Sequence, residues 1–223
     1  MSKPTLLYFP ARGRAEVIRL VLAEAGVEYD EHHLGKGSPP AASGRPTDMA
    51  VLTEQRVLPF GAAPVWEEPG GLRLAQSAAI ANHLARRHGL LGGNPLEAAR
   101  CDERLGAVDD VRGEVRKLAV VPAEQRAAVR TQLVETILPR WLGMLERHLK
   151  PSLDATGFAV GSALTVADLA LWYLLELVRD NGLGAALEQC PALTGVLGRI
   201  AARPKIAAYL ASPRRPALTL LPK

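Results

Sequence analysis

Residues 5–34 read TLLYFPARGRAEVIRLVLAEAGVEYDEHHL, and this stretch decides the fold of the first part of the chain. It begins with a short apolar run at residues 5–9, which is stopped by Pro10 and Gly13. A run of that length between turn residues is typical of a buried strand. The stretch therefore predicts that the chain opens with a strand inside a hydrophobic core.

A helix and a second strand follow in the same stretch. From Arg14 to Ala25 apolar residues recur at helical spacing, and Gly26 stands where a glycine commonly ends a helix. Three charged side chains of this segment point away from this apolar stripe: Glu16, Arg19 and Glu24. Residues 27–34 then alternate in a polar pattern that favours a strand near the edge of a sheet. Together these segments predict a β-α-β unit.

The rest of the first 88 residues completes one layered domain. Residues 35–47 are rich in Gly, Pro and Ser and are expected to form a loop, followed by a weak helical turn at 48–55. An antiparallel hairpin with the turn Glu68-Pro69-Gly70-Gly71 and a final helix are then predicted, at residues 63–67, 72–75 and 77–88. The element order β-α-β-α-β-β-α describes a thioredoxin-like domain.

Beyond residue 95 the pattern is helical only. Leu105, Val108, Val111, Val115 and Leu118 line one predicted helix, and a second, from Ala123 to Leu149, is expected to kink at Pro139. A helix that is apolar all round starts at a capping box, Thr165 to Asp168, and one or two short helices broken at Pro204 cover 192–211. The predicted class is α/β plus all-α: a thioredoxin-like domain at 1–88, a linker at 89–95 and an all-helical domain at 96–223.

Composition narrows the function classes. The chain has 223 residues, 48% of them hydrophobic and 22% charged, which excludes collagen, coiled coil and disorder. The net charge of +4 is spread along the chain, with no basic patch interleaved with aromatics, so nucleic-acid binding is not expected. With no cleavable leader pattern and no apolar stretch of membrane-spanning length, we expect a cytoplasmic protein.

A thioredoxin-like redox enzyme needs a cysteine after the first strand, where a helix N-terminus depresses the pKa of its thiol. The segment here is Tyr8-Phe9-Pro10-Ala11-Arg12-Gly13-Arg14, and both cysteines, Cys101 and Cys190, lie outside this domain. A redox mechanism that uses a cysteine of this domain is therefore not expected, and any catalytic group of the domain must be another side chain.

That segment resembles the start of the cytosolic glutathione transferases of the tyrosine type, most closely their Pi and Sigma classes. Further motifs resemble the same family in the same order: Ala62-Ala63-Pro64-Val65, Gln76-Ser77-Ala78-Ala79-Ile80, Gly161 with Thr165-Val166-Ala167-Asp168, Ala202-Arg203-Pro204-Lys205, and Leu210-Ala211-Ser212-Pro213. The resemblance covers nearly the whole chain, which makes it far more specific than any single motif.

The resemblance implies a glutathione site in the first domain. Tyr8 would donate a hydrogen bond to the glutathione thiolate, and Arg14 would hold the loop or orient Tyr8. Ala63 would pair its backbone with the tripeptide before a cis Pro64, as an added strand does. Gln76 and Ser77, at a helix N-terminus, would bind the γ-glutamyl carboxylate. An ordinary solvated tyrosine, a trans proline and a simple N-cap serine are the alternatives.

The resemblance also implies a second substrate and a second subunit. An apolar electrophile would meet Phe9, Pro10, Ala11 and Val120, the last where the Pi class carries a tyrosine. Phe60 would insert into the partner of a homodimer, and Asp110 would reach the partner's glutathione amine. Packing of Phe60 within its own chain and a plain surface role for Asp110 are the alternatives.

Three departures from the family put glutathione affinity in question. Where the family usually supplies a Trp, a Lys and a Gln to the tripeptide, this chain has Met49, Thr53 and Ala62. None of these side chains makes the same bonds, unless Lys36, Arg45 or Arg56 takes over the glycyl carboxylate.

Other kinds of site find little support. His83 and His88 are off helical register for a metal pair, and His32 and His33 point to opposite faces of a strand, so no metal is predicted. Glutathione is the only cofactor expected, as a co-substrate. The leading hypothesis is a homodimeric glutathione transferase; a glutathione-dependent isomerase or peroxidase, and a non-catalytic binding or scaffold protein, remain alternatives.

Overall fold

The computed structural model describes residues 3–35 and 44–217, and its first part is built on a mixed sheet of four strands. The strand order is β2-β1-β3-β4, with β1 parallel to β2 and antiparallel to β3. The strands are β1(Thr5–Tyr8), β2(Asp30–His33), β3(Val65–Glu67) and β4(Arg73–Ala75). As predicted, the polar strand β2 is at an edge, with His32 buried and His33 half-exposed on opposite faces.

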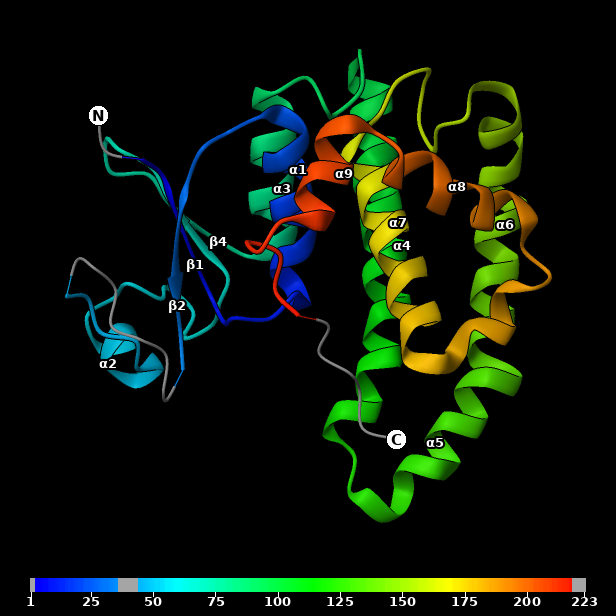
Figure 1. Cartoon of the computed structure of the whole chain (residues 1–223), viewed down its shortest axis with the longest axis horizontal. Helices are drawn as coiled ribbons and strands as arrows, with labels where there is room; N and C mark the ends of the chain where they lie inside the picture. The colour runs from blue at the N-terminus through cyan, green and yellow to red at the C-terminus, as the bar shows by residue number, and fades with distance from the viewer. Residues whose placement is uncertain (1–2, 36–43, 218–223) are drawn as a thin grey trace. The chain divides into compact units, whose positions relative to one another are not determined.

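Helices cover this sheet on both faces (Figure 1). α1 and α3 pack together on one face, and the short α2 lies on the other. Their bounds, with the 3-10 turn that precedes α1, are η1(Gly13–Ala15), α1(Glu16–Ala25), α2(Met49–Glu54) and α3(Ser77–Arg87). Gly26 ends α1 with φ 72°, and Asp48 caps α2 by accepting from the backbone N–H groups of Ala50 and Val51.

Two charged residues of α1 are buried, which its helical pattern does not predict. Its charged residues Glu16 and Arg19 point away from the apolar stripe, yet both side chains are fully buried. They are buried because a segment from the far end of the chain covers that face and brings polar partners with it: Tyr209 donates to Glu16 at 3.1 Å. Helical periodicity describes a single helix and carries no information about such a distant partner.

The second part of the chain is helical throughout its described residues. α7 forms its centre: it is buried on nearly all sides and contacts both α4 and α8 (Figure 1). Its expected capping box is present between Thr165 and Asp168. The helices are α4(Pro95–Val120), η2(Ala123–Gln125), α5(Arg126–Gln132), η3(Leu133–Ile137), α6(Leu138–Thr156), α7(Val166–Val178), η4(Arg179–Leu183), η5(Gly184–Leu187), α8(Pro191–Ala201) and α9(Pro204–Ala211).

The interruption expected at Pro139 is present, but it precedes the proline. η3(Leu133–Ile137) is a π-helical stretch, and α6 begins immediately after it with Pro139 in its first turn. Proline lacks the N–H that would bond the preceding turn, and the wider π turn accommodates this without ending the helix. The predicted kink is therefore a local change of helix type.

The chain divides into two compact units, which we describe separately. The first contains the residues up to His88 together with the segment that begins at Ala208; the second runs from Gly89 to Ala207. The division differs from the expected domain 96–223, because the last described residues bind to the Glu16 side chain of α1 and to the Tyr29 carbonyl just before β2. We propose a domain assignment in which 89–95 stays the linker and the terminal segment is counted with the first unit.

Candidate active site

The strand register brings three of the predicted site segments together. Val65 on β3 pairs with Leu7 on β1 and with Ala75 on β4. Because both pairings are antiparallel, Tyr8, Pro64 and Gln76, each one residue beyond a paired position, lie at the same end of the sheet. Neighbouring strands are about 5 Å apart, so the three positions span about 10 Å across that end.

Tyr8 ends β1 with its ring buried and its hydroxyl bound to the start of the next helix. The backbone N–H of Arg14 donates to the Tyr8 hydroxyl oxygen at 2.8 Å. Gly13 makes this approach possible, since a Cβ at that position would lie 2.4 Å from the hydroxyl. The Arg14 main chain therefore holds the Tyr8 hydroxyl, while the Arg14 residue itself is exposed. The hydroxyl oxygen accepts, and its proton is left to donate.

Arg19 lies behind this arrangement as a fully buried cation. Its guanidinium carbon is 5.8 Å from the centre of the Tyr8 ring, and its Nη1 donates to the Ala11 carbonyl at 2.8 Å. Its Nε and Nη2 donate to the two carboxylate oxygens of Glu31 at 2.9 and 3.0 Å. Burial raises the pKa of Glu31, but the bonds from Arg19, Tyr29 and His33 outweigh it and hold that pKa below its usual range.

The two other segments at this end of the sheet have unusual backbones. The Ala63–Pro64 peptide is cis, as predicted, and Ala63 lies outside the strand that begins at Val65. Gln76 has φ 74° and ψ 115°, a backbone conformation that residues other than glycine rarely adopt. Strain of this kind collects at functional sites. Gln76 is exposed, and Ser77 begins α3 beside it, so free backbone donors face the same end of the sheet.

Met49, Thr53 and Ala62, where the sequence departs from the family, carry no charged group. Met49 packs against a hydrophobic cluster below α2, and the Thr53 hydroxyl donates to the Met49 carbonyl at 2.7 Å. Of the suggested replacements, Arg45 makes two bonds to Glu67, which Arg73 also binds. The exposed Arg56 has φ 57°, and Lys36 lies outside the described residues.

The remaining predicted residues are distributed over both units. Phe9 and Pro10 are exposed and Ala11 is half-buried, all next to Tyr8 in sequence. Phe60 is 70% exposed, so it does not pack within its own chain. Asp110 and Val120 are exposed on α4, in the second unit.

Sequence reasoning missed a buried polar group beside the site: Glu16, Arg19, Glu31, Tyr209 and Arg215. Glu16 and Arg19 stand three apart on one helix, which is a recognisable ion-pair spacing. Their partners Glu31, Tyr209 and Arg215 come from β2 and from the end of the chain. No local pattern indicates those pairings.

Two general features concern the part of the chain that the structure describes. It contains no group of three or more His, Cys, Asp or Glu side chains arranged to hold a metal ion. None of its helices combines the length and the apolar character needed to cross a membrane.

Comparison with known proteins identifies the family. The family model "Glutathione S-transferase, N-terminal domain" matches residues 4–86, and "Glutathione S-transferase, C-terminal domain" matches residues 109–213. Glutathione S-transferase P 1 of Xenopus laevis is 33% identical, covering 98% of this chain and 96% of that protein. Glutathione S-transferase alpha-1 of Rattus norvegicus is 32% identical over 94% of this chain and 88% of its own length.

Solved structures agree. The glutathione S-transferase from Ascaris lumbricoides superposes with a TM-score of 0.81 at 28% identity, over 96% of this chain and 98% of that chain. The chain therefore belongs to the glutathione S-transferase family, and it is an enzyme of that kind. Its relatives carry both alpha and P names, so the likeness extends beyond the Pi and Sigma classes.

Proposed function

We propose that this transferase activates the thiol of glutathione with Tyr8 and directs the thiolate at an apolar electrophile. The observation that carries the proposal is the strand register, which supports a common site for Tyr8, Pro64 and Gln76. An extended tripeptide is roughly 10 Å long, about the span from β1 to β4 at that end of the sheet.

Tyr8 supplies the chemistry. Its oxygen accepts from the Arg14 N–H, so its own proton is available to a thiolate. A hydrogen bond to a charged acceptor is worth about 1.5–3 kcal/mol. Such a bond holds the pKa of the glutathione thiol below its usual range and raises the thiolate fraction at neutral pH. Catalysis then consists of thiol activation and positioning, without a covalent enzyme intermediate.

Glutathione is held by backbone groups and a helix terminus. The backbone of Ala63 pairs with the cysteinyl part in the manner of an added strand. Gln76 and Ser77 bind the γ-glutamyl carboxylate, where the α3 N-terminus favours an anion. Among the described residues the glycyl carboxylate has weak support, because Met49 is apolar and Arg45 is engaged by Glu67, which leaves the exposed Arg56. We therefore expect a higher KM for glutathione than a site with a cation held in place would give.

The second substrate and the assembly follow from the family resemblance. The electrophile meets Phe9, Pro10 and Ala11 beside Tyr8, and the resemblance assigns Val120 to the same role. The chain forms a homodimer anchored by Phe60, whose exposed aromatic ring is suited to a partner's pocket. Asp110 reaches the partner's glutathione. A cytoplasmic location suits the two buried free thiols, Cys101 and Cys190.

Glutathione titration and conjugation kinetics test the proposal on Tyr8→Phe and Gln76→Ala. Tyr8→Phe is expected to bind glutathione normally and to lose about 10- to 100-fold in kcat at neutral pH, the equivalent of one charge-assisted bond. The loss shrinks at alkaline pH, where the thiol ionises unaided. Gln76→Ala is expected to weaken glutathione binding by about tenfold, since an amide contact to a carboxylate is lost.

Tyr173→Phe is the matched control, because it removes the same hydroxyl from a buried tyrosine of α7. It is expected to leave kcat and its pH dependence unchanged. An unchanged rate in Tyr8→Phe across pH would remove Tyr8 from the mechanism, and unchanged affinity in Gln76→Ala would move the glutathione site elsewhere.

A further inference from the structure

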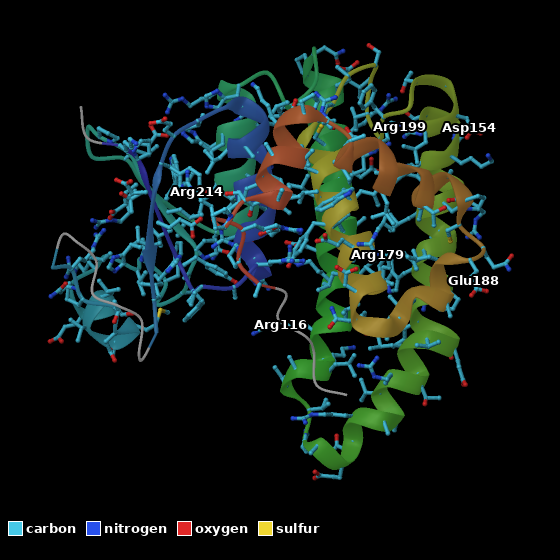
Figure 2. All side chains as sticks on the ribbon, viewed as in Figure 1. Arg116, Asp154, Arg179, Glu188, Arg199 and Arg214 are labelled. Atoms are coloured by element: carbon cyan, nitrogen blue, oxygen red, sulfur yellow. The ribbon has the colours of Figure 1, made fainter. Side chains whose placement is uncertain are left out.

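The last described residues, Tyr209–Pro216, form a C-terminal segment that binds the first unit at several points. Tyr209 and Arg215 both reach Glu16 on α1. Arg214, labelled in Figure 2, donates to the Tyr29 carbonyl at 2.8 Å and lies 4.5 Å from the centre of its ring. The Pro216 carbonyl accepts from Arg12 Nε at 3.0 Å. These contacts join the end of the chain to the residues around the site.

Glu16 is the centre of these contacts, a carboxylate with no exposed surface. Its Oε1 accepts from Arg215 Nε at 2.8 Å, and its Oε2 accepts from the Tyr209 hydroxyl at 3.1 Å. The side chain of Arg215 is only 9% exposed, so this ion pair is shielded from solvent. A buried carboxylate needs such partners because burial without them is costly. The C-terminal segment provides two of them.

Arg19 has two possible anionic partners, Glu16 and Glu31, and its Nη1 also donates to two loop carbonyls, closely to Ala11 and at 3.4 Å to Arg12. Glu31 takes two of its donors, while Nη1 lies 2.8 Å from the Ala11 carbonyl and 3.5 Å from Glu16 Oε2. The shorter contact is the hydrogen bond, and the longer one is only an ion-pair distance. With Glu16 already satisfied by the C-terminal segment, Nη1 stays on Ala11. Without that segment, Glu16 would draw Nη1 away from the carbonyl.

Ala11 belongs to the loop that connects Tyr8 to the helix start holding its hydroxyl. Two hydrogen bonds hold this loop, Phe9–Gly13. Arg19 donates to the carbonyl of Ala11 within the loop, and Arg12 of the loop donates to the Pro216 carbonyl. The same Arg19 guanidinium faces the Tyr8 ring. A shift of Arg19 toward Glu16 would therefore break its bond to the Ala11 carbonyl and, at the same time, move the cation that faces the Tyr8 ring.

We propose that the C-terminal segment positions Tyr8 through Glu16 and Arg19, so that Tyr209, Arg215, Glu16 and Arg19 are positioning residues for the transfer reaction. The inference rests on the proposed role of Tyr8. The charged and titratable groups that face this relay are Arg19 from α1, Glu31 from β2, Tyr29 before β2, and Tyr209 and Arg215 from the C-terminal segment. None of the four positioning residues touches the reacting atoms in this scheme.

The test compares Arg215→Gln with its neighbour Arg214→Gln. Both variants remove one cation from the C-terminal segment, but only Arg215 binds Glu16. Arg215→Gln is expected to lower kcat about tenfold, the scale of a misplaced catalytic group, with less than about a twofold change in KM for glutathione. The apparent pKa of the bound thiol, read from thiolate absorbance, should rise. Arg214→Gln should leave all three quantities unchanged.

A rescue variant separates positioning from simple destabilisation. In Glu16→Gln/Arg215→Gln the competing charge is gone, so Arg19 returns to Ala11 and kcat recovers most of the loss. The chain has only 4 tyrosines, so the Tyr8 ring signal in tyrosine-labelled protein can be assigned by its disappearance in Tyr8→Phe. That signal should move in Arg215→Gln, and in the double variant it should return.

Distinct results overturn the two proposals. If Tyr8→Phe shows its expected loss while Arg215→Gln behaves like Arg214→Gln, the positioning relay is wrong and the role of Tyr8 stands. If the double variant is worse than Arg215→Gln, Glu16 is not a competitor and the relay is also wrong. If Tyr8→Phe has no effect on rate, the proposed function fails, whatever the signal of the Tyr8 ring does.

Discussion

Gly13 is the residue on which the position of the Tyr8 hydroxyl depends most directly. Its φ is +42°, and the space where a Cβ would stand is filled by the phenol oxygen. A glycine here both permits the turn and lets the hydroxyl reach the Arg14 N–H. A side chain at position 13 would occupy the space that the Tyr8 hydroxyl fills. The proposed thiol activation therefore requires glycine at this position.

Gly13→Ala is expected to reduce kcat by at least about tenfold, because the hydroxyl must leave its place by an ångström or more. Conjugation kinetics with glutathione at saturating concentration measure this loss. Gly70→Ala is the control: that glycine also has a positive φ, +104°, but its Cβ would meet nothing within 4 Å. The control should lose stability without losing kcat, and an equal loss of kcat in both variants would contradict the fit argument.

Single residues also mark how far the sequence predicts the site. Tyr8, Pro64 and Gln76 follow from a family resemblance because each belongs to a short motif, and the cis bond at Pro64 is confirmed. Glu16 and Arg19 are different: their helical spacing places them outside the apolar stripe, yet they are buried. Their burial depends on Tyr209 and Arg215, which no local pattern connects to α1.

At the scale of elements, the order of strands and helices is predictable, whereas the type of helix is not. Alternation and helical periodicity predict the four strands and most of the helices close to their places, but they merge α5 and α6 into one helix and miss the turns at 179–187. The π-helical stretch η3 ahead of Pro139 is invisible to these patterns, because it changes hydrogen bonding without changing which side chains face the core. Pairing of α1 with β2 likewise appears only in the structure, through Arg19 and Glu31.

The α1–β2 ion pair predicts a pH dependence of stability. The pKa of Glu31 in the folded chain is held below its ordinary value of 4.5, so the unfolded chain binds protons more readily. The stabilisation is therefore fully present above about pH 4.5, the ordinary value, and is lost as pH falls from there through the lower pKa of the folded chain. Thermal unfolding between pH 7 and pH 3 should show Tm falling in acid, and Glu31→Gln should flatten that slope.

Glu28→Gln is the control for the pH experiment. The pKa of Glu28 is also lowered, by a hydrogen bond and charge from Lys3, but this pair lies on the surface. Salt screens exposed pairs far more than buried ones. Any flattening in Glu28→Gln should disappear at high ionic strength, while that of Glu31→Gln persists. A slope in Glu31→Gln identical to that of the unsubstituted chain would exclude Glu31 as its source.

At the scale of the whole molecule, the first unit is discontinuous in sequence. It consists of the residues up to His88 and of the segment that begins at Ala208, with the second unit inserted between them in the chain. Removing the bonds of Arg214 and Arg215 is therefore expected to destabilise residues near the N-terminus, and not the helices of the second unit that precede these arginines in the sequence.

Hydrogen exchange can measure this in Arg214→Gln/Arg215→Gln. Amides of α1 and β2 are expected to exchange at least about tenfold faster, the scale of one lost charge-assisted bond, because their covering segment is released. Amides of α7, which is buried within the second unit, serve as the internal reference and should be unchanged. Equal acceleration in α7 would mean that the two units unfold together.

The partners of Glu16 have a consequence for synthesis of the chain. Tyr209 and Arg215 stand 193 and 199 positions after it, so the chain up to Arg215 must leave the ribosome before that carboxylate has both partners. During translation the nascent first unit has its sheet and helices available, but Glu16 then has its ion pair with Arg19 without the bonds from Tyr209 and Arg215. Residues 89–207, which belong to the second unit, are synthesised before the two partners of Glu16.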